Sequence, residues 1–328
     1  MDSTAVKQLA RECGADIVGV TSMDRFEGAP KQMDPRYIFP DAKAMLVMGF
    51  RILRGTLRGV EEGTFFVNYS SMGYAAINQI IQPMVLWHFC RRLEDDGYEA
   101  VPIPNIFAWS NTVTTVQPDK SKIGDPRPEF SRPVRPDLPA PDVFFSLRIA
   151  AFCAGLGEIG WSKMFITPQF GPRVRLAAVL TDMPLDPDPL YDGPPLCDRC
   201  MLCARDCSTQ AISKTESIKT TIAGRELEWS DIDYMKCSMG FCGASPEYNP
   251  FMITEEDRVG FTTPTYGRAQ QYKVPPQYGY GRGLEGARGC IRACMEHLTQ
   301  QGKLTNRFKN PFRVRKPWKL TDDNHADP

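Results

Sequence analysis

The order of apolar and polar residues predicts alternating helices and strands along the first 185 residues. Apolar side chains recur at helical spacing in three segments, which cover residues 6–13, 73–97 and 143–157. Alternating or uniformly apolar runs, typical of strands, cover residues 15–22, 44–50, 98–104 and 173–182. We expect Ser3 or Thr4 to cap the first helix, and Pro83 either to kink the second helix or to mark its true start. Interleaving of this kind is typical of a layered α/β or α+β domain.

Two long stretches of the chain fit neither helices nor strands. Nine prolines occupy the forty residues from Pro102 to Pro141, and loops of such length are commonly functional coverings. Residues 183–195 form a second, turn-rich stretch directly before the cysteine-rich part. We therefore predict a core domain over residues 1–190, a loop-rich cluster-binding module over residues 191–300 and a C-terminal tail over residues 301–328.

Charge, hydrophobicity and cysteine content limit the cellular compartments and the binding partners that we expect for this protein. Lys plus Arg and Asp plus Glu both number 39, so the net charge predicts no electrostatic attraction to nucleic acid or to an anionic membrane. The N-terminus has no signal-peptide pattern, and the apolar runs are shorter than the roughly 18 residues of a membrane span. We expect a cytoplasmic protein without a membrane span. Eleven cysteines in such a chain favour bound metal over disulfides, because cytosolic thiols stay reduced.

Eight of the cysteines have the spacing of iron–sulfur ligands. They are Cys197, Cys200, Cys203, Cys207, Cys237, Cys242, Cys290 and Cys294. The first four form a C-x2-C-x2-C-x3-C run, in which the first three wrap one [4Fe-4S] cluster and the fourth binds another. Cys290 and Cys294 repeat the C-x3-C spacing, so by pseudo-symmetry Cys294 completes the first cluster. Cys207, Cys237, Cys242 and Cys290 then hold the second cluster.

Other readings of these and nearby residues are weaker. Zinc sites use paired knuckles, and a third cysteine at this spacing is unusual for zinc. The remaining cysteines, Cys13, Cys90 and Cys153, are expected to be small buried hydrophobes. Two G-x-G-x-x-G segments, at residues 155–160 and 281–286, lack the strand-before-helix context of a dinucleotide site, so we predict close backbone packing instead.

The histidines offer no cofactor ligand by their sequence context. No D-x-H-x-x-G motif is present, so a histidine from that motif bound to a corrinoid is not expected. His88 lies between Trp87 and Phe89 and is expected to pack in the core. His297, close behind Cys294, is expected at a solvated position, with tuning of a cluster as the alternative.

Residues 154–212, which read AGLGEIGWSKMF and end in CDRCMLCARDCSTQAI, resemble a particular enzyme segment. It is the segment of cobalamin-dependent reductive dehalogenases that joins the corrinoid domain to the ferredoxin-like module, and epoxyqueuosine reductase shares its layout. A weaker resemblance to the same proteins, in the same order, covers residues 9–22, residues 39–50 and the predicted helix before residue 98. The resemblance implies a nitroreductase-like α/β core that holds base-off cobalamin, and a ferredoxin-like module, inserted or C-terminal, that passes electrons to cobalt. It also implies a small-molecule substrate and a low-potential donor such as ferredoxin or flavodoxin.

The resemblance further implies site residues. Asp142 lies within about one position of the proton-donating aspartate of epoxyqueuosine reductase, with capping of the next helix as the alternative. Arg173 and Arg175 match a basic position that lines the dehalogenase substrate pocket, with ordinary salt bridges as the alternative. In the proline-rich loop, which would cover the corrin, Phe107 and Trp109 are candidate wall residues or simple anchors.

Five departures from these families are visible. Residues 105–123 contain no tyrosine, and no twin-arginine signal is seen, which disfavours respiratory dehalogenation. Ala287 stands where epoxyqueuosine reductases have the first cysteine of a second run, and the chain ends before any helical repeats, which disfavours queuosine chemistry. Ser208 follows Cys207 where proline is usual, a change that the cluster tolerates. The competing hypotheses are an epoxyqueuosine-reductase-like enzyme, a two-cluster electron-transfer protein without corrinoid and a flavin-bearing reductase.

Overall fold

The computed structural model describes residues 1–30, 33–62, 68–105, 143, 145–241 and 289–310. Its centre is a four-stranded sheet with the order β1-β2-β6-β3, antiparallel at every pairing. The strands are β1 (Ile17–Ser22), β2 (Ala44–Arg51), β3 (Ala100–Ile103) and β6 (Val174–Thr181). All four were predicted. Because the pairings are antiparallel and the helices are separate layers, the fold is of mixed α+β type.

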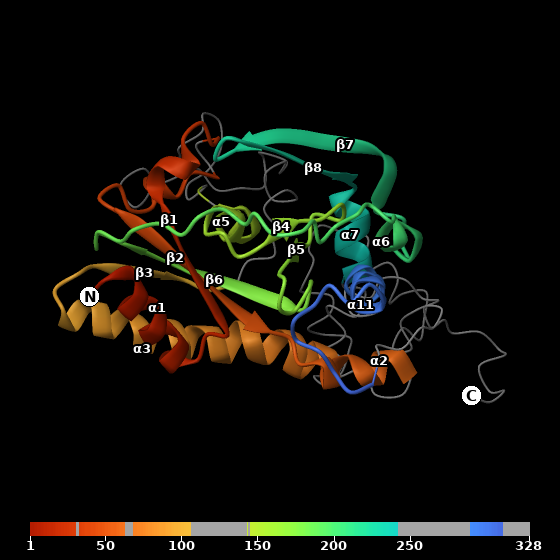
Figure 1. Cartoon of the computed structure of the whole chain (residues 1–328), viewed down its shortest axis with the longest axis horizontal. Coiled ribbons are helices and arrows are strands. Elements are labelled where there is room, and N and C mark those ends of the chain that lie inside the picture. The colour runs from red at the N-terminus through yellow and green to blue at the C-terminus, as the bar shows by residue number, and fades with distance from the viewer. Residues whose placement is uncertain (31–32, 63–67, 106–142, 144, 242–288, 311–328) are drawn as a thin grey trace, which may run out of the picture.

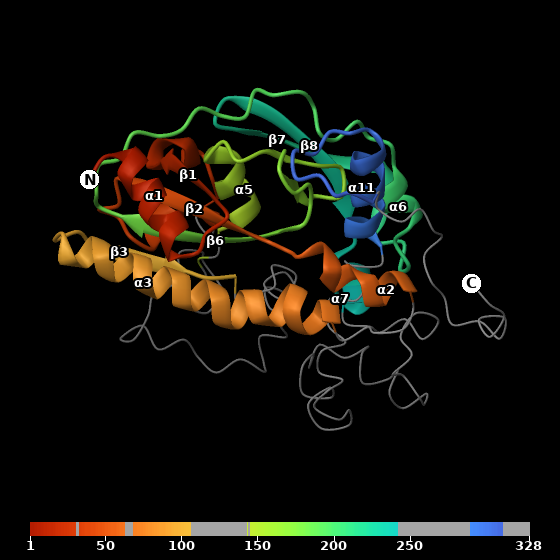
Figure 2. The ribbon, with the colours of Figure 1, turned by 60° about the horizontal axis from the view of Figure 1, so that its bottom comes forward.

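Helices cover both faces of this sheet (Figures 1 and 2). One face packs against α1 (Ser3–Cys13) and α3 (Gln82–Asp95), and the other against α5 (Leu147–Cys153). Side chains of β2 alternate between the two cores, with Leu46 on the α1 side and Val47 on the α5 side. Both are fully buried. The uniformly apolar run of this strand is therefore explained by cover on both faces.

The helix ends differ in part from the sequence expectation. Asp2, not Ser3 or Thr4, caps α1, and its Oδ1 accepts a hydrogen bond from the Ala5 N–H at 2.8 Å. Pro83 lies in the first turn of α3 and so marks the true start of that helix. Two π-helical segments, η5 (Tyr69–Ala75) and η6 (Ile77–Ile81), lead into it.

The remaining elements are short helices and hairpins. The helices are η1 (Met23–Phe26), η3 (Pro35–Tyr37), η4 (Arg54–Leu57), α2 (Arg58–Glu62), α6 (Leu202–Arg205), α7 (Tyr234–Phe241) and α11 (Cys290–Gln300). The hairpins pair β4 (Glu158–Ile159) with β5 (Phe165–Ile166), and β7 (Ile212–Ile222) with β8 (Arg225–Ile232). The β7–β8 hairpin was not predicted from the sequence.

The cysteine-bearing helices α6, α7 and α11 gather at one end of the molecule, at the right in Figures 1 and 2. They are not separate from the core. Ile291, Met295 and Leu298 of α11 belong to the same hydrophobic cluster as α1 and α3, and Trp229 of β8 belongs to the cluster under α5. The boundaries at residues 190 and 300 stay a prediction.

Glycines of the segment 155–160 allow close backbone approach, as predicted. Gly155 has φ +72°, and a Cβ atom there would lie 2.0 Å from the carbonyl oxygen of Pro189. Only glycine fits this position, because both the backbone angle and the space exclude a side chain. The second such segment, residues 281–286, lies outside the described residues.

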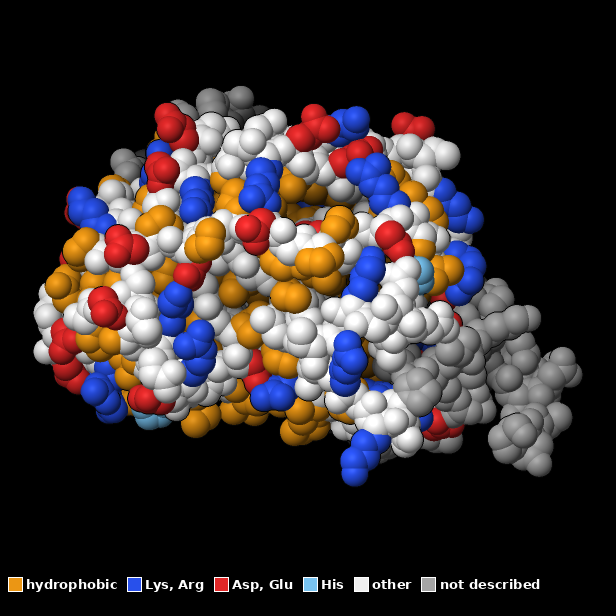
Figure 3. Space-filling view, viewed as in Figure 1, with side chains coloured by type: hydrophobic (Ala, Val, Ile, Leu, Met, Phe, Trp, Pro, Cys, Tyr) orange, Lys and Arg blue, Asp and Glu red, His pale blue; other side chains and the backbone are white. Residues whose placement is uncertain are grey.

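Several surface and burial features complete the fold. His88 is exposed and lies edge-on to Trp87 with ring centroids 5.0 Å apart, so the expected core position is wrong. Hydrophobic side chains line the lower edge of Figure 3, along which α3 runs in Figure 1. Cys90 and Cys153 are buried as expected, whereas Cys13 is half-buried. Within the described parts of the chain, no helix is long and apolar enough to span a membrane.

Candidate metal centre

The loop that carries the first three cysteines is held at its start by Glu158 of β4 and by Trp161, two residues after that strand. The backbone N–H of Cys197 donates to the Glu158 carboxylate, and the N–H of Trp161 donates to Cys197 Sγ at 3.3 Å. Arg199 (φ 57°) and Met201 (φ 59°) then both adopt left-handed backbone conformations. Such residues each cost about 1–2 kcal/mol, so the loop keeps this shape only because its surroundings hold it.

Helix α11 brings a fourth thiol to this loop. Burial raises the pKa of Cys294 well above its usual value, and Cys197, Cys203 and Cys200 raise it further by their charges. Burial also raises the pKa of Cys203 to about 12, again with Cys197 and Cys200 contributing. A metal centre bound at this loop would offset these raised pKa values, because its positive charge stabilises the thiolates of Cys203 and Cys294. The donor set therefore fits the predicted first [4Fe-4S] cluster.

Three of the four cysteines predicted for a second cluster are described. Cys207 is buried, and its Sγ accepts a hydrogen bond from the Ala211 N–H at 3.3 Å. Cys290 packs against the hydrophobic cluster that contains Cys203 and Cys207. Cys237 lies on α7 and is exposed. Cys242 lies outside the described residues.

Arg148, at the start of α5, connects Cys237 and Cys290 electrostatically. Desolvation lowers the pKa of Arg148, and the charges of Cys237 and Cys290 oppose that shift more than any other neighbour. Its Nη1 donates to the backbone carbonyl of Lys163 at 2.8 Å. The two cysteines therefore share a cationic neighbour, which suits a site that carries net negative charge such as a thiolate-bound cluster.

Arg175 pairs with Phe50 across β2 and β6, and Arg173 lies just before the first residue of β6, so strand alternation predicts both on one face. Arg173 is 1% exposed, and its guanidinium donates to the carbonyl of Ile52 and, at 2.9 Å, to Asn306 Oδ1. Burial, with Arg54 and Arg51 adding to it, lowers the pKa of Arg173 to about 10.

Arg175 has a different set of neighbours, both of them tyrosines. Its Nη2 donates to the hydroxyl of the buried Tyr69 at 2.9 Å, and its Cζ lies 4.4 Å from the ring centroid of Tyr74. Among the described residues neither Arg173 nor Arg175 forms an ion pair with a carboxylate, and the Nε of each is buried without a hydrogen-bond partner. The sequence did not single out Tyr69, whose residue type and position in an uncharged segment carry no signal for this contact.

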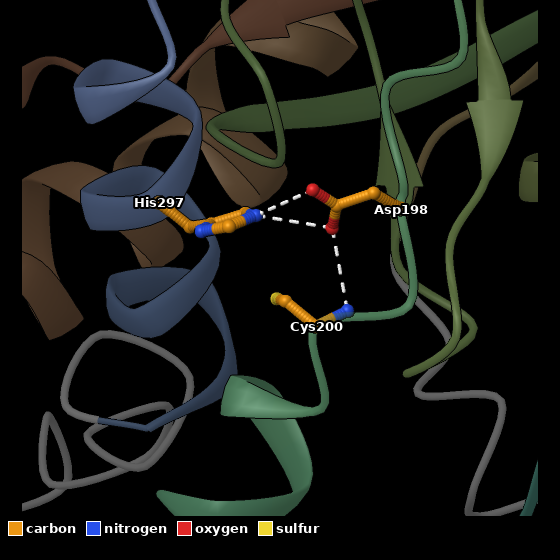
Figure 4. A group of neighbouring side chains, drawn as sticks. All are labelled: Asp198, Cys200 and His297. Carbon is orange, nitrogen blue, oxygen red and sulfur yellow. Dashed lines mark hydrogen bonds and ion pairs between the residues drawn. The ribbon is translucent and has the colours of Figure 1, made fainter.

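A second feature that the sequence did not reveal is a clamp between the cysteine loop and α11 (Figure 4). His297 Nε2 lies 2.8 Å from Asp198 Oδ2. Gln301 Nε2 donates to the same oxygen at 2.7 Å. Partial burial alone would raise the pKa of Asp198, but the hydrogen bonds from Gln301 and His297 lower it to about 2. Potential metal-binding atoms of Asp198, Cys200 and His297 all lie within 4.8 Å of one another. His297 is thus partly buried and bound, not simply solvated.

Asp142, Phe107 and Trp109 all lie in residues 106–142, outside the described part of the chain.

No family model matches the chain. A tetrachloroethene reductive dehalogenase of Sulfurospirillum multivorans is 42% identical over 113 residues, which are 30% of this chain and 22% of that protein. A second one, from Desulfitobacterium hafniense, is 44% identical over 68 residues, 20% of this chain and 12% of that protein. The resemblance to reductive dehalogenases is confirmed by these relatives, although the matched segments span about a fifth or less of their length.

Solved structures of two kinds of protein are similar to this one. The catabolic reductive dehalogenase NpRdhA has a TM-score of 0.49 at 19% identity, over 96% of this chain and 39% of that chain. An epoxyqueuosine reductase solved with a transfer-RNA stem loop has a TM-score of 0.42 at 15% identity, over 92% of this chain and 76% of that chain.

Proposed function

We propose that the protein is a corrinoid-dependent iron–sulfur reductase of the reductive-dehalogenase type. In this proposal electrons pass through two [4Fe-4S] clusters to base-off cobalamin and then to a small-molecule substrate. The observation that carries it is the convergence of Cys294, from a distant helix, on the C-x2-C-x2-C loop. The choice of this type of reductase is supported by the segment that is about 40% identical to tetrachloroethene reductive dehalogenases.

For the first cluster we assign Cys197, Cys200, Cys203 and Cys294. Support comes from the raised pKa values of Cys200, Cys203 and Cys294, to which neighbouring thiols contribute. The N–H···S bond that Trp161 donates to Cys197 adds to it, because such contacts stabilise cluster sulfurs. For the second cluster we assign Cys207, Cys237, Cys242 and Cys290. Support comes from the N–H···S bond at Cys207 and from the cationic neighbour, Arg148, that Cys237 and Cys290 share.

Cobalamin and the substrate belong, in this proposal, against the sheet face that carries Arg173 and Arg175. The buried Nε atoms of both side chains have no partner among the described residues, so they can donate to the amides of a corrin or to a substrate. Bound cobalamin would supply a strongly reducing cobalt centre, while the protein supplies position, electrons and a proton. Asp142 remains the proposed proton donor.

The finer architecture follows the same proposal. The antiparallel sheet is the nitroreductase-like core, and the α6, α7 and α11 region is the ferredoxin-like module. We place the protein in the cytoplasm, because clustered thiols persist there. The electron donor would be a low-potential carrier such as ferredoxin or flavodoxin, and no nucleic acid is required.

A metal and cofactor inventory tests this function. Protein purified without oxygen and reconstituted with cobalamin should hold about eight iron atoms, as two four-iron clusters require, and about one cobalt per chain. Cys294→Ser should lose the first cluster and about half the iron, whereas the matched variant Cys90→Ser, at a buried thiol of α3, should lose none. Iron without cobalt would favour a plain electron carrier, and flavin released on denaturation would favour a flavin reductase.

A further inference from the structure

A buried arginine of α11 contacts an acidic residue at the end of α6, and both of these helices carry C-x3-C cysteine pairs. Helices α6 and α11 lie side by side in both ribbon views (Figures 1 and 2). Cys203 and Cys207 belong to α6 and the residues just after it, and Cys290 and Cys294 belong to α11. Arg292, midway between the last two, is 2% exposed. A charged side chain is buried to this extent only when it is paired.

Three carboxylates surround Arg292, and each comes from a different place in the fold. Its Nε lies 2.6 Å from Glu61 Oε1 of α2, and its Nη1 lies 3.2 Å from Glu296 Oε2, one turn along α11. The same Nη1 lies 3.7 Å from Oδ2 of Asp206, the residue before Cys207. All four side chains are at most 12% exposed. We call these four residues the buried ion cluster.

The helical geometry of α11 places Arg292 on the side of the helix opposite to its two cysteines. Residues four apart in an α-helix project on one side, and the residue midway between them projects on roughly the opposite side. Cys290 and Cys294 therefore share one side of α11, and Arg292 points away from it into the buried ion cluster. The N-terminal end of α11 has no side-chain cap, since Gly289 holds the cap position. The buried ion cluster thus constrains the rotation of the helix about its axis from one side, in addition to the buried Ile291, Met295 and Leu298.

Electrostatic interactions make the buried ion cluster costly to disrupt. Burial raises the pKa of Glu61, against the pull of Arg292, so this carboxylate is costly to bury and needs its guanidinium partner. Asp206 is also bound from the outside by Arg205, whose Nε lies 2.6 Å from its Oδ1 and whose side chain is 59% exposed. Breaking a buried pair leaves an uncompensated charge, which is far more costly than losing an exposed one.

We propose that Arg292 is a positioning residue, which holds α11 in the one rotation that presents Cys294 to the first cluster and Cys290 to the second. The presence of the two clusters is taken from the proposed function. The orientation of the Cys290 and Cys294 thiols does not depend on it. It assigns a shared control of both clusters to a residue that binds neither. Loss of Arg292 should therefore affect the two clusters together.

The test compares four variants of the full chain. Arg292→Gln should lose iron from both clusters in parallel and lose the paramagnetic coupling between the reduced clusters. Arg292→Lys, which keeps the charge, should restore part of both. The matched control Arg205→Gln removes the exposed arginine from the same Asp206 and should change neither. Leu93→Ala, a cavity in α3, should lower stability without loss of iron.

A second pair of variants covers the case in which Arg292→Gln does not fold. Glu61→Gln keeps a hydrogen-bond acceptor for Arg292 Nε and should keep the iron, whereas Glu61→Ala removes the anchor and should behave like Arg292→Gln. Equal iron content in Glu61→Ala and Glu61→Gln, or full iron and unchanged coupling in folded Arg292→Gln, would overturn the inference. So would iron loss in Leu93→Ala to the same degree.

An alkylation measurement separates this inference from the proposed function. If the wild-type protein holds no iron, the proposed function fails, yet the orientation of the thiols is still measurable. In that protein Arg292→Gln should raise the alkylation rates of Cys290 and Cys294 by about tenfold, because the helix rotates more freely. Cys90 serves as the internal reference. Unchanged rates would overturn the positioning role.

Discussion

Gly155→Ala should destabilise the fold through one defined collision. Gly155 has φ +72°, and an added Cβ would lie 2.0 Å from the carbonyl oxygen of Pro189. The segment around Pro189 cannot move away freely, because the Asp188 N–H donates to the Val20 carbonyl at 2.9 Å and the Asp188 carboxylate accepts from the Val20 N–H at 2.8 Å. The substitution therefore forces a shift in the stretch that leads into the cysteine loop.

The magnitude has two parts that a control can separate. A side chain in the left-handed region costs about 1–2 kcal/mol, and the lower entropy of the unfolded alanine chain offsets about 0.5 kcal/mol of this. Overpacking against fixed backbone adds about 1–3 kcal/mol. Gly224, in the β7–β8 turn, has a similar φ of +76° but nothing within 4 Å of its Cβ position. We expect a loss of about 3 kcal/mol for Gly155→Ala and about 1 kcal/mol for Gly224→Ala.

Thermal unfolding of both variants checks these values. At about 2 °C per kcal/mol, Tm should fall by about 6 °C for Gly155→Ala and about 2 °C for Gly224→Ala. Because the displaced stretch leads to Cys197, the first variant should also hold less iron than the second. Equal shifts in Tm for the two variants would show that the close contact with Pro189 plays no part in stability.

Two further predictions concern single contacts of the site. Asp198→Asn should lower the midpoint of urea unfolding near pH 6. The pKa of Asp198 is lowered to about 2 in the fold, so its stabilising effect is complete above about pH 4 and disappears as pH falls toward 2. A difference in urea midpoint between variant and wild type that stays constant over this pH range would contradict a stabilising role for the contacts of Asp198 with His297 and Gln301. Tyr69→Phe should cost about 2 kcal/mol in urea unfolding, because the hydroxyl accepts from the charged Arg175 at 2.9 Å in a buried setting. A cost below about 0.5 kcal/mol would mean that Arg175 is held by other contacts.

The β7–β8 hairpin shows where local patterns were insufficient. Its first strand, Ile212–Ile222, is mostly exposed and polar, so it lacks the regular alternation that marks a half-buried strand. The turn uses Ala223 at φ 49° before Gly224, and alanine is an unusual residue for that conformation. The hairpin is stabilised by contacts such as those of buried Trp229 with the core under α5. The residues next to Trp229 in the sequence do not predict these contacts.

Short-range information in the sequence determined the strands, the start of α3 and the first three cysteines of a cluster run. These depend on side-chain period, on the fixed φ of Pro83 and on loops of two residues, all of which act within a few positions. The two-fold pattern of C-x3-C pairs also pointed to Cys294 as a partner of this loop.

Only the tertiary structure decided which distant side chains meet. Asp198 and His297 are 99 positions apart, Arg175 and Tyr69 are 106 apart, and Arg292 reaches Glu61 across most of the chain. No periodicity encodes such contacts, because each arises only after the sheet and α11 have packed on a common core. The ligand spacing is thus a local property of this sequence, whereas the orientation of the ligands belongs to the fold.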